Sequence, residues 1–230
     1  MKILAIESSS EAVSVALMVD NDCLSRHEVA PRRHAELLLP YMDELLAQAG
    51  LQLQQLDALA FGCGPGAFTG IRIATGVIQG VAYAADLPVV PVSTLASLAQ
   101  GVRREEGREK VIAAIDARMK EIYWGAYVAD DDGLMSPVNR EYVIAPDHAP
   151  DVDGSGWYGA GSGWDTYKMV LPEHYGVKLK NFAGESLPNA IDVATLAKRD
   201  FSNGLAVSAE LAQPVYLRNK VAEKKKSQVS

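Results

Sequence analysis

Three short polar turns carry the side chains of this 230-residue chain that could do chemistry. Each follows an apolar run, and they span residues 7–10, 116–118 and 159–163. Carboxylates can hold Mg²⁺ through water, while hydroxyls and backbone N–H groups in turns can hold phosphate oxygens. Together the turns predict a vestigial nucleotide cleft that is built from Glu7, Ser8, Ser9, Asp116, Arg118, Gly159 and Gly161.

The residue types limit what this cleft could do. The first turn reads ESSS and has no glycine to let phosphates approach its backbone, so ATP hydrolysis fits it poorly and weak nucleotide binding fits better. Asp116 and Arg118 are explained equally well as a local pair that stabilises a turn. The glycine-rich turn GAGSG is weak evidence, because such turns are common after strands.

Nucleophilic and metal chemistry find less support. A serine of the first turn with His34 as its base lacks the strand–turn–helix context G-x-S-x-G, and turn serines usually bond their own backbone. The four histidines show no H-x-x-x-H spacing. Cys23 and Cys63 make neither a metal-ligand nor a disulfide pattern, so we expect buried free thiols and no metal site.

The amino-acid composition limits which partners the protein could bind and in which cellular compartment it could occur. The net charge is −7, which argues against unaided nucleic-acid binding because phosphates require a basic surface. Hydrophobic residues make up 48% of the chain, which is ordinary for a globular protein. No apolar stretch reaches the length of a membrane span or a signal peptide. We therefore expect a soluble cytoplasmic protein.

The elements that must position the turns occur in one order, twice. Hydrophobic periodicity predicts three strands, then a helix, a strand, a helix, a strand and a helix, before a charged stretch VRREEGREK. A similar series of strands and helices follows. The expected strands are 2–6, 12–19, 23–29, 56–61, 88–92, 111–116, 121–128, 140–144 and 177–182, and the expected helices are 32–49, 69–85, 93–101, 164–171 and 189–201.

This repetition predicts an α/β fold with two duplicated ribonuclease-H-like lobes, as in actin-like ATPases (the ASKHA class). We place the N-terminal lobe at residues 1–104 and the C-terminal lobe at 105–218, with a disordered tail at 219–230. Proteins of this architecture bind ligands between their lobes, at turns that leave strand ends.

A stripe of small residues marks the helix expected at 69–85. Gly76, Gly80 and Ala84 recur at every fourth position, so they lie on one face and let another backbone come close. The stripe either packs within this chain or docks a partner helix, and the apolar helix at 32–49 would widen such a docking face. The residues predicted to form this interface are Leu38, Tyr41, Met42, Leu45, Ile73, Gly76, Val77, Gly80 and Ala84.

Six segments make the chain resemble the TsaB (YeaZ) family of bacterial proteins that are needed to make threonylcarbamoyladenosine (t6A) on tRNA. They are MKILAIESS, RRHAELLLP, AFGCGPGAFTGIRIATGVIQGVAYA, PVVPVSTL, AAIDARMKEIYWGAY and PVYLRN, and they span nearly the whole sequence. The resemblance implies an ASKHA-fold paralogue of the catalytic subunit TsaD. TsaD carries two metal-binding histidines where this chain has Thr94 and Leu98, which cannot replace imidazole ligands.

The resemblance therefore implies a non-catalytic subunit that forms a heterodimer with a TsaD-like subunit and works beside a TsaE-like ATPase. It implies a homodimer when the partner is absent, and contact with tRNA only through the complex. The resemblance implies no required cofactor. ADP or ATP is the nucleotide whose binding at the interface of the complex should be tested. Two alternatives stay open: a small ASKHA ATPase or phosphotransferase that acts alone, and a glycoprotease-like peptidase.

Overall fold

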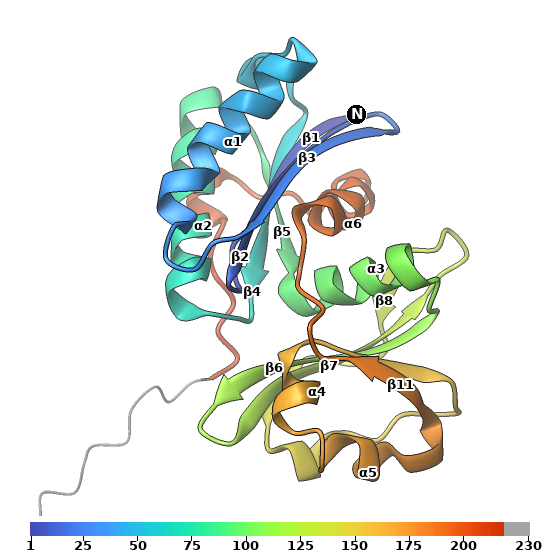
Figure 1. Ribbon diagram of the computed structural model, residues 1–230. Coiled ribbons are helices and arrows are strands. Elements are labelled where there is room, and N and C mark those ends of the chain that lie inside the picture. Colours follow the sequence, from blue (N-terminus) through green and yellow to red (C-terminus); the bar gives the residue numbers. More distant parts are fainter. Residues whose placement is uncertain (219–230) are drawn as a thin grey trace, which may run out of the picture.

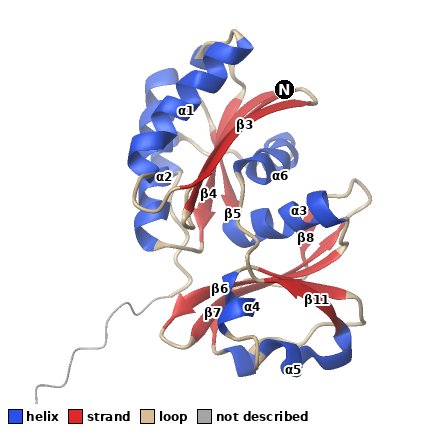
Figure 2. Cartoon of the chain, viewed as in Figure 1, coloured by secondary structure: helices blue, strands red, loops and turns tan. Residues whose placement is uncertain are grey.

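The chain forms two lobes, one above the other in Figure 1, in a computed structural model that describes residues 1–218. Each lobe is built around one β-sheet with helices beside it (Figure 2). The tail at 219–230, which we predicted to be disordered, lies outside the described residues. Within residues 1–218, none of the helices is both long enough and apolar enough to cross a lipid bilayer.

The first sheet has the strand order β3-β2-β1-β4-β5. Tight turns join the first three strands into an antiparallel meander, whereas β4 and β5 run parallel to β1 and therefore need helical crossovers. The crossover helices α1 and α2 lie on the same face of the sheet (Figure 1). The elements are β1 (Lys2–Glu7), β2 (Ala12–Val19), β3 (Asp22–Val29), α1 (His34–Ala49), η1 (Leu53–Gln55), β4 (Ala58–Gly64), α2 (Phe68–Ala85) and β5 (Val89–Ser93).

The second sheet repeats this topology. Its order is β11-β10-β6-β7-β8. The strand β6 corresponds to β1: the antiparallel strands β7 and β8 lie on one side of it, and the parallel strands β10 and β11 lie on the other. The duplicated fold that we predicted is confirmed. The strands are β6 (Lys110–Arg118), β7 (Glu121–Ala129), β8 (Met135–Pro137), β9 (Tyr142–Ile144), β10 (Trp157–Ala160) and β11 (Leu179–Ala183).

Two predictions in the second lobe were too simple. The strand expected at 140–144 is present as the shorter β9, but the prediction missed β8, and both strands pair with β7. The helix expected at 164–171 is replaced by α4 (Ser162–Thr166) and α5 (Leu171–Tyr175). Pro172 lies in the first turn of α5, where its missing N–H breaks no helical hydrogen bond. Short 3-10 turns, η2 (Pro146–His148) and η3 (Gly176–Lys178), connect these pieces.

Two helices each cover the sheet of the other lobe. Helix α3 (Thr94–Glu106) follows the first sheet but packs its Leu95 and Leu98 on the second. Helix α6 (Ala190–Ser202) follows the second sheet but packs its Val193 and Ala194 on the first. Both helices therefore pack across the predicted lobe boundary at 104/105. The side chains of Arg104 and Asp192 link them through two contacts of 2.9 Å.

The segment after α6 ties the two lobes together. Val207 forms a β-bridge with Val89, and η4 (Ala209–Leu211) leads into a stretch that packs on α2. The side-chain amide of Gln79 donates to the carbonyl of Ala212 at 3.0 Å. At the far end, Arg218 donates to the carbonyl of Ala117 at 3.0 Å, and it also pairs with the carboxylate of Glu121.

Candidate functional site

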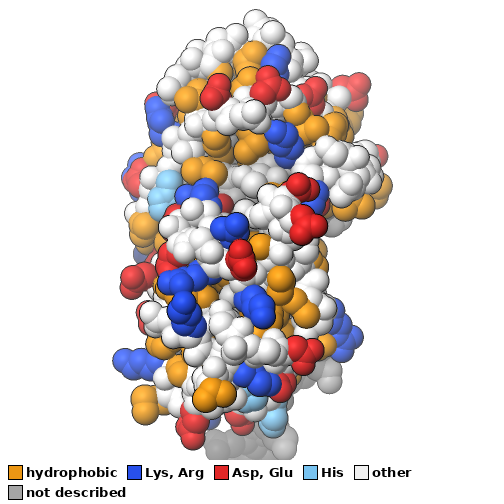
Figure 3. Space-filling model, turned by 90° about the vertical axis from the view of Figure 1, so that its right-hand side faces the viewer, with side chains coloured by type: hydrophobic (Ala, Val, Ile, Leu, Met, Phe, Trp, Pro, Cys, Tyr) orange, Lys and Arg blue, Asp and Glu red, His pale blue; other side chains and the backbone are white. Residues whose placement is uncertain are grey.

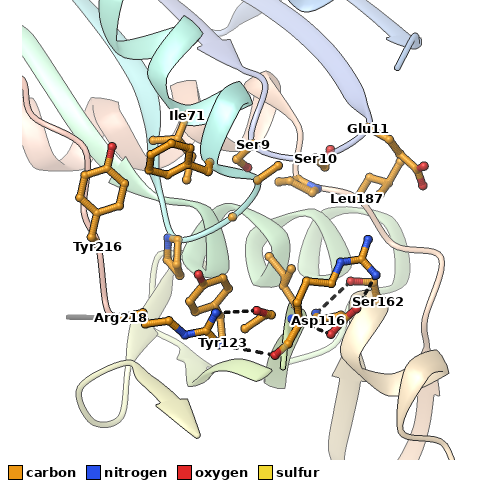
Figure 4. A pocket seen from close by; sticks show the side chains of 18 of the residues that line it. Ser9, Ser10, Glu11, Ile71, Asp116, Tyr123, Ser162, Leu187, Tyr216 and Arg218 are labelled. Atoms are coloured by element: carbon orange, nitrogen blue, oxygen red, sulfur yellow. Dashed lines mark hydrogen bonds and ion pairs between the residues drawn. The ribbon is translucent and has the colours of Figure 1, made fainter. Parts of the chain in front are cut away.

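A cleft of about 1220 Å³ opens between the two lobes. The β1–β2 turn and the start of α2 form its upper side, and the β6–β7 turn with α4 forms its lower side (Figure 4). Three of the predicted residues, Ser9, Asp116 and Arg118, line it. The Asp116 carboxylate accepts hydrogen bonds from the Arg118 backbone N–H at 2.9 Å and from its guanidinium at 3.1 Å, so the local turn pair exists as well.

The other four predicted residues do not line the cleft. Glu7 and Ser8 are buried above it, and the Ser8 hydroxyl donates to the carbonyl of Gly70 at 3.0 Å. A Cβ atom at Gly159 would overlap the ring of Trp164, and one at Gly161 would lie 2.7 Å from the carbonyl oxygen of Ala114. These two glycines make room for the lobe's own core rather than for a phosphate.

The loop before α2 closes the β1–β2 turn from the side. The Ala67 N–H donates to the Ser9 carbonyl at 2.7 Å. A Cβ atom at Gly66 would lie 2.6 Å from that same oxygen, and a Cβ atom at Gly70 would overlap the carbonyl oxygen of Ser8. The glycines that permit close backbone approach are therefore present, but they serve the contact between this loop and the turn.

Glu7 is a buried acid with only part of its carboxylate satisfied. Oε1 accepts a hydrogen bond from the Ser9 N–H at 2.6 Å, while Oε2 has no hydrogen-bond partner among the described residues and faces Gly62. Burial removes water from the charged form and raises the pKa of Glu7 above its ordinary value of 4.5, although the hydrogen bonds from Ser9 and Ser8 oppose the rise.

We expect Glu7→Gln to remove a pH dependence of stability. Between pH 4.5 and the raised pKa of Glu7, the unfolded chain has lost a proton that the folded chain keeps, so the free energy of unfolding falls as the pH rises through this window. Urea unfolding should be measured below and above this pH window. The free energy of unfolding of the variant, relative to that of the wild type, should increase as the pH rises. Glu11→Gln, which changes an exposed acid of the same turn, is the control. Parallel pH profiles for Glu7→Gln and the wild type would contradict the prediction.

Several residues that line the cleft were missed from the sequence. Arg72 lies 3.8 Å above the centre of the Phe68 ring, and its Nε donates to the Tyr216 hydroxyl at 3.0 Å. Arg32 and Arg218 also line the cleft. Arg72 could have been found from the sequence, because it is a lone arginine in the otherwise apolar helix expected at 69–85. Tyr216 and Arg218 could not, because they reach the cleft only through the folded path of the C-terminal segment.

The cleft differs in charge from the protein as a whole. Four arginines line it against two carboxylates, in a chain whose net charge is −7. On the face that Figure 3 shows, basic and acidic side chains are interspersed instead. The residues concerned are Arg32, Arg72, Arg118 and Arg218 against Glu11 and Asp116.

The structure does not pair a serine hydroxyl with His34. The imidazole Nε2 lies 3.0 Å from the backbone carbonyl oxygen of Ser10, and the Ser10 hydroxyl accepts from the N–H of Ala12 at 3.2 Å. Cys63 is buried as expected, whereas Cys23 is exposed at the start of the edge strand β3. In residues 1–218, no three His, Cys, Asp or Glu side chains converge as metal ligands would.

The small-residue stripe of α2 faces outward. Gly76, Gly80 and Ala84 are exposed, and a Cβ atom at either glycine would meet nothing within 4 Å. Close packing among residues 1–218 therefore does not explain the stripe. The neighbouring side chain of Tyr83 is 83% exposed, while Ile73 and Val77 are half-buried beside the stripe.

Helix α1 contributes less to this face than we predicted. Leu38, Met42 and Leu45 are at most 2% exposed and pack in the core of the first lobe, so they cannot contact a partner directly. Their spacing places them on one side of the helix, and that side faces the lobe's own sheet. Tyr41 is half-buried and Leu39 is 47% exposed.

The two duplicated lobes and the cleft between them define a protein of the ASKHA class whose first turn is closed by its own chain. Comparison with known proteins narrows this class. The chain is 43% identical over 229 residues to the Escherichia coli "tRNA threonylcarbamoyladenosine biosynthesis protein TsaB", and the match covers 98% of both chains. It is 39% identical to the Haemophilus influenzae protein of the same name, over 98% and 97% of the two chains. The chain belongs to the TsaB family.

A structure and a family model agree with this assignment. The solved structure named "YeaZ from Pseudomonas aeruginosa" is 46% identical, with a TM-score of 0.87, and the match covers 94% of this chain and 99% of that one. The family model described as TsaD, tRNA N6-adenosine threonylcarbamoyltransferase, matches residues 25–156. The resemblance seen in the sequence is thus confirmed along nearly the whole chain.

Proposed function

We propose that this chain is a non-catalytic subunit in the formation of t6A at adenosine 37 of tRNA, and that it acts by forming a heterodimer with a TsaD-like catalytic subunit. Relatives that match nearly its whole length are named for the biosynthesis of this nucleoside. The observation that carries the proposal is the outward-facing stripe Gly76, Gly80 and Ala84, which leaves the surface of α2 open to another helix.

The chemistry of the stripe fits a helical partner. Gly76 and Gly80 have no side chain to hold a second backbone away, and glycine costs about 1 kcal/mol per helix position relative to alanine. Burial of the half-exposed Ile73 and Val77 beside the stripe would help to offset this cost. A pair of helices from each of two related lobes would bury an area on the order of 1,200–2,000 Å², which is typical of stable complexes. The same face could pair two copies of this chain when the partner is absent.

The absence of catalysis in this chain alone is supported by the start of α3. The resemblance places Thr94 and Leu98 where TsaD carries its metal-binding histidines. Thr94 is fully buried, and Leu98 packs in the core of the second lobe. A Cβ atom at Gly161 would lie 2.7 Å from a methyl group of Leu98. A packed alkyl group and a buried hydroxyl cannot replace two imidazoles.

The acidic charge of the chain indicates that tRNA is held mainly by the complex, because the partner must supply most of the basic surface. In this proposal a TsaE-like ATPase is the third subunit, and no cofactor is required by this chain. ADP or ATP at the interface of the complex is the only cofactor that we include.

We expect the purified chain to form no t6A and to hydrolyse no ATP, because Glu7 is buried and the first turn is closed. Together with a TsaD-like subunit, a TsaE-like ATPase, a threonylcarbamoyl donor and tRNA, it should be required for t6A, measured by mass spectrometry of digested tRNA. Metal-dependent ATP turnover by the isolated chain that Asp116→Ala abolishes, and that Asp147→Ala at an exposed position does not, would restore the ATPase alternative. Covalent capture of a serine by a fluorophosphonate probe would restore the peptidase alternative.

A further inference from the structure

We propose that the β6–β7 turn has two conformations and that Arg218 latches it in the strained one. Arg218 reaches the turn from the C-terminal strap, by which we mean residues 205–218. The turn contributes Arg118 and Met119 to the lower side of the cleft, so its conformation sets the shape of that side. The proposal concerns this chain alone, and it stands independently of the function proposed above.

The backbone of the turn is strained. Arg118, Met119 and Lys120 have φ values of +60°, +54° and +62°. Arg118 pairs with Glu121, so Met119 and Lys120 are the two central residues of the hairpin. A two-residue hairpin turn with positive φ at both central positions prefers Asn-Gly. Larger side chains are disfavoured in this conformation because their Cβ atom comes too close to a backbone carbonyl oxygen.

The side chains of the turn do not hold it in this conformation. Met119 is 63% exposed, and the Arg118 side chain is 87% exposed. Strained backbone persists only where surrounding contacts determine it. One such contact is local, because the Asp116 carboxylate accepts a hydrogen bond from the Arg118 N–H at 2.9 Å. Further contacts come from the strap.

Arg218 supplies these distant contacts. Its guanidinium donates to the carbonyl oxygen of Ala117 at 3.0 Å and to that of Arg118 at 3.5 Å, and it pairs with the carboxylate of Glu121. It therefore bonds to both strands of the hairpin, before and after the two central residues. Figure 4 shows its side chain pointing from the strap toward the side of the pocket that carries Asp116. Charge-assisted hydrogen bonds of this kind are the stronger ones in proteins.

The first lobe fixes the position of Arg218. The Val215 N–H donates to the carbonyl oxygen of Cys63 at 2.8 Å, and the Tyr216 hydroxyl accepts from Arg72 Nε at 3.0 Å. In Figure 1 the strap runs down beside α2 to the second lobe. Because these contacts anchor the strap on β4 and α2, the latch joins the two lobes. Its release frees the turn to take a relaxed conformation.

Hydrogen–deuterium exchange of the full-length chain, followed by mass spectrometry, tests the latch. Arg218→Gln should accelerate exchange at residues 116–122 about tenfold, because glutamine lacks the charge and the planar fork of the guanidinium. NMR backbone chemical shifts of residues 118–120 should show that φ is no longer positive throughout. Exchange at residues 58–64 in the buried strand β4 should stay slow, which shows that the chain remains folded. Glu121→Gln, which keeps the two carbonyl contacts, should accelerate exchange at 116–122 about threefold.

The matched control is Arg26→Gln. Arg26 also donates to a backbone carbonyl, that of Ser25 at 2.9 Å, and also pairs with a carboxylate, that of Glu44. It lies in the first lobe on β3, away from the turn. Its substitution should therefore leave exchange at residues 116–122 unchanged.

A rescue experiment tests the strain itself. Met119→Asn together with Lys120→Gly gives the hairpin the central residues that its backbone prefers, and both positions are exposed. Added to Arg218→Gln, this pair should return exchange at residues 116–122 to about the wild-type rate. The latch is overturned if folded Arg218→Gln and Glu121→Gln both exchange there no faster than Arg26→Gln. The strained conformation is overturned if the Asn-Gly pair does not slow exchange in Arg218→Gln.

Discussion

The same substitution at two positions of α2 is expected to change stability in opposite directions. Gly70→Ala should destabilise the fold by about 3 kcal/mol, because its Cβ atom would overlap the carbonyl oxygen of Ser8 and a backbone atom cannot rotate away. Gly80→Ala should stabilise it by about 1 kcal/mol, because alanine is the better helix former and its Cβ atom meets nothing within 4 Å.

Urea unfolding of the wild type and the two variants measures this difference. Because both variants carry the same chemical change in one helix, each serves as the control for the other. If Gly70→Ala is as stable as the wild type, the loop before α2 does not press on the β1–β2 turn. If Gly80→Ala lowers stability, the stripe is covered within this chain.

Gly80→Leu is expected to abolish association with the TsaD-like subunit while the isolated chain stays folded. A leucine on the stripe would hold the partner backbone away from α2, and exclusion from the centre of an interface should weaken binding about a hundredfold or more. The open space around Gly80 predicts that the side chain is accommodated in the free protein. Surface plasmon resonance against the immobilised partner gives the affinity, and circular dichroism gives the fold.

Glu105→Leu is the control for this experiment. It adds the same side chain to a helix at a position that is also exposed, but on α3 rather than on the stripe. A Gly80→Leu variant that unfolds would mean that the stripe packs internally. A folded variant that binds with unchanged affinity would place the interface elsewhere on the molecule, and the proposed function would then lose its main support.

The order of the elements in the first lobe was determined by the sequence alone, because it depends on local signals. Alternation of apolar residues predicts the strands of the first meander, and the small residues at every fourth position of α2 predict one face of a helix. Since these patterns follow from backbone geometry, the duplicated topology could be predicted without any tertiary contact.

Which surface a helix covers was decided only by the tertiary structure. Apolar faces on α3 and α6 show that each helix is buried, yet they do not show that each covers the other lobe's sheet. The same limit applies to α1. The spacing of Leu38, Met42 and Leu45 groups them on one side of the helix, but only packing against the first sheet shows that this side faces inward.

The candidate site depends even more on contacts between distant segments. The ESSS turn and the glycines at 66 and 70 are both visible in the sequence, but the close approach of one to the other is not. Likewise, Arg32, Arg72 and Tyr216 belong to three separate parts of the chain, and only the fold brings them to the lining of one cleft. Residue types limit the available chemistry, whereas the folded path of the chain decides which of these groups share one cleft.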